Sequence, residues 1–164
     1  MNTRRLTQCA LLSAILYIVY FMGSFVTYFE LVSFIILLYG TTLPKKISWF
    51  SIVVFCILVM LTKGVAPWSI MYLLILPQYA LIYNTLSRWT KSEYVYGLVG
   101  AVLSFCMGTL IDLPYLLTAG LGSKSLWITL VLGFQVSIGN AICTFIATLF
   151  LYKTLSKVLK RVIM

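Results

Sequence analysis

The chain has 164 residues, of which 62% are hydrophobic and only 9% charged, and its mean hydropathy is +1.07. Soluble domains are about half apolar and a quarter charged, so this composition excludes a water-soluble, disordered or collagen-like chain. Twelve Lys and Arg against three Asp and Glu give a net charge of 12 − 3 = +9, which in so apolar a chain indicates membrane topology rather than nucleic-acid binding. We therefore predict an all-α, polytopic membrane protein that forms a single domain over residues 1–164.

Six apolar segments follow one another along the chain, at residues 6–23, 29–42, 47–62, 68–87, 94–117 and 126–152. A transmembrane helix needs roughly 17–25 residues, and the first, fourth, fifth and sixth segments reach that length. The first segment follows Arg4 and Arg5 as a signal peptide would, but it is too long for a typical signal-peptide core, so we interpret it as a membrane helix. The second and third segments are short and close together, which leaves a re-entrant hairpin as the alternative to two spans.

The basic residues favour six spans with both termini in the cytoplasm. This topology places two basic residues outside, Lys63 and Lys124, and ten inside: Arg4, Arg5, Lys45, Lys46, Arg88, Lys91, Lys153, Lys157, Lys160 and Arg161. The positive-inside rule predicts such a distribution. A hairpin entering from outside would place Lys45 and Lys46 in hydrocarbon, at a cost of about 2.5–3.5 kcal/mol each. The four Trp residues fall at predicted membrane boundaries, as in an aromatic belt: Trp49 and Trp89 inside, Trp68 and Trp127 outside.

Several classes of chemistry are missing from the sequence. The chain has no His, which excludes His-ligated haem, His-based zinc sites and Ser-His hydrolases. It has no Gly-rich phosphate loop, so any ATP-driven work requires another chain. Its Cys residues form no CxxC pair and lie in apolar segments, which is typical of small buried side chains: Cys9, Cys56, Cys106 and Cys143. We expect neither an enzyme nor a cofactor or metal site.

Small side chains recur at a spacing of four in the first segment, at Ala10 and Ala14 and at Cys9 and Ser13. Residues at this spacing share a helix face, and faces of small residues let another membrane helix approach closely. The sequence leaves open whether these pairs pack inside the bundle or dock a partner protein.

Acidic, amide and aromatic residues gather toward the predicted outer half of the bundle. A few polar groups among apolar walls are what a small-molecule pocket requires. Pro77 and Pro114 are expected to bend the fourth and fifth helices. We predict a substrate-binding set made of Glu30, Trp68, Tyr72, Asp112, Tyr115, Trp127, Gln135 and Asn140, with a lid that includes Tyr28 and Phe29.

Some of these residues also have purely structural interpretations. Trp68 and Trp127 lie where aromatic-belt residues anchor a helix at the membrane boundary, and Glu30 lies where a negative charge stabilises the start of a helix. Asp112 favours function, because a carboxylate within a span is costly unless it faces a cavity or a partner.

The start of the chain, a short basic tail followed by Leu6-Thr7-x-x-Ala10-x-x-x-Ala14, resembles the substrate-binding S components of energy-coupling factor (ECF) vitamin transporters. Residues 30–34, 68–73 and 112–115 are similar to the same family more loosely. The likeness covers the whole chain in length and topology and depends on a short motif. It implies that Ala10 and Ala14 dock on a shared transmembrane T component, which two ATPase subunits drive.

The resemblance also implies a mechanism. An S component captures a vitamin or related micronutrient near the extracellular side, with the first loop as a lid, and topples in the plasma membrane to release it inside. No signature of thiamin, biotin, riboflavin or folate binding is visible, so the substrate stays open, with cobalamin suggested only by general similarity to the family. No nucleic-acid partner is expected.

Two other functional classes stay open. A secondary carrier working alone would use Asp112 as an ion or proton relay. A non-transporting membrane scaffold would bind no small molecule.

Overall fold

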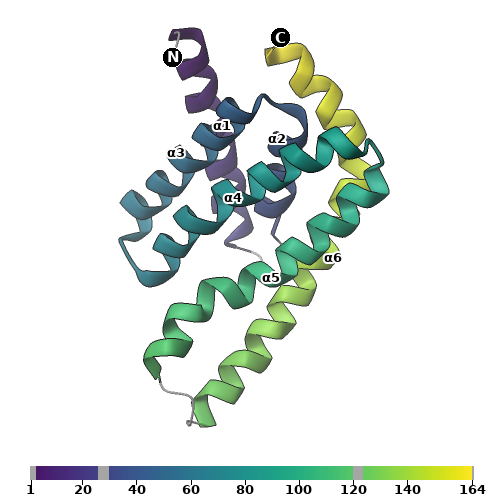
Figure 1. Cartoon of the computed structure of the whole chain (residues 1–164). Helices are drawn as coiled ribbons and strands as arrows, with labels where there is room; N and C mark the ends of the chain where they lie inside the picture. The colour runs from purple at the N-terminus through teal and green to yellow at the C-terminus, as the bar shows by residue number, and fades with distance from the viewer. Residues whose placement is uncertain (1–2, 26–29, 120–123, 164) are drawn as a thin grey trace.

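The computed structural model describes residues 3–25, 30–119 and 124–163, with the side chains at 115–130, 132 and 162–163 outside that description. All regular secondary structure in these ranges is helical, which confirms the all-α prediction (Figure 1). The six helices are α1 (Thr3–Gly23), α2 (Val32–Thr42), α3 (Lys45–Lys63), α4 (Pro67–Trp89), α5 (Glu93–Ala119) and α6 (Lys124–Ile163).

Five helices, α1, α3, α4, α5 and α6, are long and apolar enough to cross a membrane. Their outer surface is apolar as well, since large side chains such as Leu98, Phe134 and Phe150 are more than half exposed. A soluble monomer rarely exposes so much contiguous apolar surface, whereas lipid chains would cover it. These features support a multi-pass membrane protein.

Helix α2 is the exception in length. It has 11 residues, or about 16 Å of helix, against a hydrocarbon core of about 30 Å. Eight of its residues are buried, because α1, α3, α4, α5 and α6 all pack against it. The expected span at residues 29–42 is therefore realised as a short central helix inside the bundle, and a sixth crossing stays a prediction.

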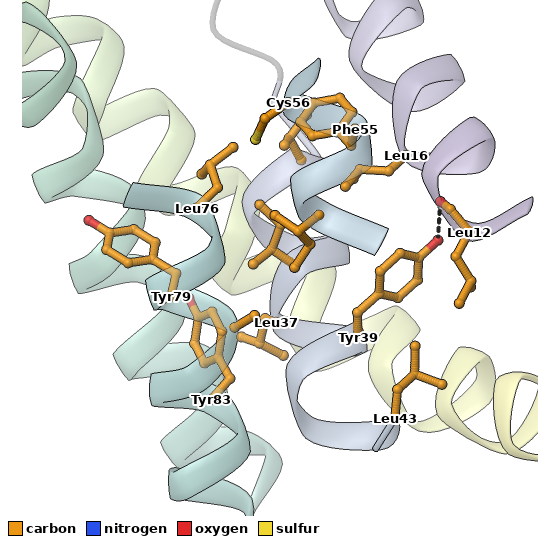
Figure 2. Close-up of a cluster of buried hydrophobic side chains, with 14 of the residues drawn as sticks. Leu12, Leu16, Leu37, Tyr39, Leu43, Phe55, Cys56, Leu76, Tyr79 and Tyr83 are labelled. Atoms are coloured by element: carbon orange, nitrogen blue, oxygen red, sulfur yellow. Dashed lines mark hydrogen bonds between the residues drawn. The ribbon is translucent and has the colours of Figure 1, made fainter. Parts of the chain in front are cut away.

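The core of the bundle lies around α2. Figure 2 shows Leu37 facing α4 near Tyr83, and Tyr39 facing α1, where its hydroxyl donates a hydrogen bond to the carbonyl of Leu12 at 3.1 Å. Leu37, Phe55 and Tyr83 are completely or almost completely buried. This dense packing fixes α2 relative to the surrounding helices.

Helices α2 and α4 come unusually close at Gly40. A Cβ atom on Gly40 would lie 2.6 Å from Cβ of Tyr83 and 2.9 Å from the backbone oxygen of Ala80. One turn after Ala80 on α4, the side-chain amide of Asn84 donates hydrogen bonds to the carbonyls of Gly40 and Leu43 at 3.3 and 3.4 Å and so caps the end of α2. Helix α2 ends here because Pro44 forces Leu43 into an extended conformation (φ −98°, ψ 156°).

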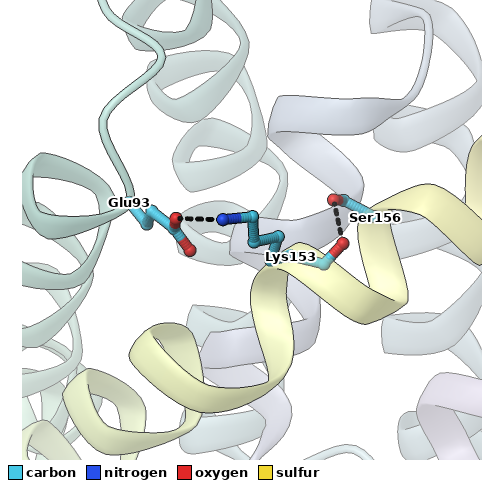
Figure 3. Close-up of polar contacts among 3 residues, drawn as sticks. All are labelled: Glu93, Lys153 and Ser156. Carbon is cyan, nitrogen blue, oxygen red and sulfur yellow. Dashed lines mark hydrogen bonds and ion pairs between the residues drawn. The ribbon is translucent and has the colours of Figure 1, made fainter.

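Helices α5 and α6 form a long hairpin that continues well past the start of α2 (Figure 1). Helix α6 runs 11 residues beyond the expected segment 126–152. The extension stays on the bundle because Leu159 packs against the core while its lysines face outward. Lys153 also pairs with Glu93 of α5 at 3.7 Å (Figure 3), but an exposed pair of this kind contributes at most about 1 kcal/mol.

Both termini and the turns α2–α3 and α4–α5 lie toward one end of the bundle (Figure 1). This end carries the ten basic residues that the sequence assigns to the cytoplasm. Lys63, at the end of α3, and Lys124, at the start of α6, belong to the opposite end. The alternation of the helices thus separates the basic residues ten to two.

Candidate functional site

Glu30 lies just before α2 and outside the five long helices. It interacts electrostatically with Tyr20 of α1, Tyr72 of α4 and Cys143 of α6. Side chains of three longer helices, α1, α4 and α6, therefore lie within electrostatic range of the carboxylate.

Tyr72 is the residue on which these contacts converge. The Tyr72 ring packs edge-on against Trp68 and Tyr20, with ring centroids 5.6 and 6.4 Å apart. Its backbone oxygen accepts a hydrogen bond from the Cys56 thiol at 3.5 Å. The side chain also interacts electrostatically with Asp112 of α5. We call Tyr20, Glu30, Trp68, Tyr72 and Asp112 the Tyr72 cluster.

The carboxylate of Asp112 points toward α6. A Cβ atom on Gly133 would lie 3.4 Å from Oδ2 of Asp112, an ordinary contact distance, which places the acid beside the α6 backbone at this position. Asp112 is half-buried.

The charge state of Glu30 depends on this environment. Removing a carboxylate from water disfavours its charged form, so a ligand or a neighbouring polar group that binds this carboxyl group would stabilise it. The neutral form can donate as well as accept a hydrogen bond, which suits recognition of a polar ligand group.

The structure brings four of the predicted site residues together: Glu30, Trp68, Tyr72 and Asp112. Gln135 is exposed and Asn140 half-buried on α6, and the described contacts connect neither to the cluster. Tyr28 and Phe29 lie outside the described residues, as do the side chains of Tyr115 and Trp127.

Sequence reasoning missed Tyr20 and Cys143. A signal for Tyr20 was present, because it follows the buried positions Leu12 and Leu16 at a spacing of four, which continues the inward face of α1. Cys143 was predicted only to be buried packing. It is half-buried, whereas Cys9 and Cys56 are buried as predicted. The burial predicted for Cys106 is wrong, since that thiol is exposed on α5. The reason is that burial depends on which way each helix faces.

The two small-residue pairs of α1 lie on different faces. Cys9 and Ser13 are buried against α3, where the Ser13 hydroxyl donates to the carbonyl of Ser51 at 2.7 Å. Ala10 and Ala14 are exposed. The packing interpretation thus holds for the first pair, and the second pair presents a shallow outward surface.

The described residues include no group of three or more Cys, Asp or Glu side chains that could hold a metal ion. The Tyr72 cluster offers two carboxylates, phenol and indole groups and apolar walls. Such a set can bind a small organic molecule by stacking and hydrogen bonding.

No protein-family model, no curated protein and no solved structure matches this chain.

Proposed function

We propose that this chain is the substrate-binding S component of an ECF-type importer, which captures a vitamin or related micronutrient at the extracellular side. The observation that carries the proposal is the Tyr72 cluster, which collects two carboxylates and three aromatic rings at the end of α2 away from the basic residues. The exposed Ala10–Ala14 surface supports a role for α1 in docking on a T component. Two ATPase subunits would supply the energy, and toppling would deliver the substrate.

The proposal includes six membrane crossings in the cell membrane with both termini inside. Support comes from the ten-to-two separation of basic residues between the two ends. The short α2 fits a crossing because protein rather than lipid surrounds it, so its length need not match the hydrocarbon core.

The topology predicts the accessibility of single cysteines placed in a variant whose four natural Cys are replaced by Ala. Lys45→Cys should react with a membrane-impermeant maleimide only after the cells are permeabilised. Lys63→Cys, at the opposite end of α3, should react in intact cells. Labelling of Lys45→Cys in intact cells would contradict the proposed orientation.

The ligand is best sought in the protein itself. Mass spectrometry of the chain purified from vitamin-rich medium should identify a bound small molecule. Asp112→Asn should then weaken its binding about tenfold to a hundredfold, because a hydrogen bond to a charged group contributes about 1.5–3 kcal/mol. Isothermal titration measures the affinity.

The matched control is Glu93→Gln, which neutralises an acid at the basic end and should leave affinity unchanged. An unaltered affinity in Asp112→Asn would show that Asp112 is structural. Absence of any bound molecule would favour the membrane scaffold.

A secondary carrier is the second candidate, with Asp112 as an ion or proton relay, because acids within membrane proteins often mark such relays and Glu30 and Asp112 both interact with Tyr72. Vesicles that contain this chain and no ATPase partner discriminate between the two functions. An S component alone gives no accumulation, whereas a carrier accumulates substrate when a proton gradient is imposed.

A further inference from the structure

A cleft separates α1 and α6 at the basic end of the bundle. These two helices are barely in backbone contact, and α2 packs against both of them, so α2 forms the floor of the cleft. Two adjoining hollows occupy it, and Gln8 lines both of them.

The first hollow is basic. It has a volume of about 260 Å³ and is lined by Arg4 and Arg5 of α1, by Lys160 of α6 and by the turn at Pro44. We call it the basic pocket. Three cationic side chains from the two ends of the chain therefore converge on one small space.

These three charges have no acidic partner among the described residues. The ion pair found there joins Lys153 to Glu93, and the chain's other acidic side chains, Glu30 and Asp112, belong to the Tyr72 cluster at the opposite end of α2. Like charges held close together destabilise one another. An anion in the basic pocket would remove that repulsion, and a phosphate suits the planar donors of arginine.

The second hollow is an apolar groove of about 410 Å³, with walls that include Leu11 and Ile15 of α1, Leu38 of α2 and Val158 of α6. From Arg4 to Ile15 the helix rises about 16 Å, close to half of a hydrocarbon core about 30 Å thick. The basic pocket and the apolar groove together are thus about as long as one leaflet is deep. A hydrocarbon chain attached to a group in the basic pocket would reach along the groove.

We propose that the basic pocket and the apolar groove together bind an anionic phospholipid, with its phosphate between Arg4, Arg5 and Lys160 and one acyl chain between α1 and α6. A free phosphate would leave the groove empty, and a neutral lipid would leave the three charges unbalanced. The proposal does not depend on the transport function. The Ala10–Ala14 surface is separate, since neither residue lines the groove.

The first test compares lipids and charges. Native mass spectrometry of the purified chain should show dioleoyl-phosphatidylglycerol bound more tightly than dioleoyl-phosphatidylcholine. The triple variant Arg4→Gln, Arg5→Gln, Lys160→Gln should weaken phosphatidylglycerol binding about a hundredfold, because each basic group near an anionic lipid surface contributes about 1 kcal/mol.

A matched control removes three charges from the same end without touching the pocket: Lys45→Gln, Lys46→Gln and Lys157→Gln. Its affinity should change no more than about threefold, in line with diffuse electrostatics that salt screens. Equal loss in both triple variants, or equal binding of the two lipids, would overturn the site. Displacement of the lipid by inorganic phosphate at the same concentration would identify a free-phosphate site instead.

The second test fills the groove. Ile15→Trp adds a bulky side chain at a half-exposed position of the wall and should weaken phosphatidylglycerol binding about tenfold, by removing the space for an acyl chain. Leu98→Trp, on the exposed face of α5, is the control and should bind normally. Circular dichroism verifies that both variants keep their helices. Normal lipid binding by Ile15→Trp would show that the acyl chain does not bind in the apolar groove.

Discussion

Under the proposed importer function, replacing Ala14 with Trp should abolish ATP-driven uptake while leaving substrate binding by the purified chain unchanged. Ala14 is exposed on α1, so the larger side chain does not disturb the core. It would, however, hold a partner helix away from a surface that permits close approach only while its residues are small. Ala10→Trp, one turn earlier, should have the same effect.

Uptake of labelled substrate in cells that contain the T component and both ATPases measures the first quantity, and titration of the purified chain measures the second. Leu98→Trp places the same side chain on the lipid-facing surface of α5 and should transport normally. Loss of substrate binding in Ala14→Trp would indicate misfolding and remove the docking assignment. Normal uptake would remove it as well.

Gly40→Ala should destabilise the protein by about 2 kcal/mol or more, near the upper range for overpacked cores. The added Cβ would lie 2.6 Å from Cβ of Tyr83 and 2.9 Å from the oxygen of Ala80. Neither atom can move without shifting the α4 backbone, and such a shift would also pull Asn84 away from the carbonyls that it caps.

Thermal unfolding in detergent, followed by circular dichroism, measures this loss as a lower midpoint. Gly97→Ala is the matched control, because its Cβ meets first the ring of Phe145 at 3.1 Å, a side chain that can turn aside. The control should lose clearly less stability. Equal midpoints for the two variants would show that α2 and α4 tolerate a wider separation.

The long helices could be predicted from the sequence because length and hydropathy together define a membrane helix. Helices α1, α3, α4 and α5 begin and end within three residues of the expected segments. The central position of α2 was harder to predict, because the helix is apolar on every side and has no polar face to indicate which side is exposed. The extension of α6 was missed because lysines lower its hydropathy, although Leu155 and Leu159 keep an apolar face.

The candidate site was predictable only in part. Residue chemistry and depth were enough to select Glu30 and Asp112, since acidic side chains are rare within membrane helices. Helix rotation was not available from the sequence, and it decides the rest. Ser137 and Thr144 face inward on α6, which turns Gln135 outward.

Because neighbouring helices enclose α2, the position of Glu30 in the protein does not depend on the thickness of the membrane. Changes in bilayer thickness act on helices that touch lipid, through tilt and local deformation, and the neighbours of α2 cover it except where it forms the floor between α1 and α6. In the proposed topology, a thicker membrane would raise the outer boundary along α5 and α6 while Glu30 keeps its place near Tyr20 and Tyr72. Lipid composition would thereby set how far a solute must descend before it meets the first carboxylate.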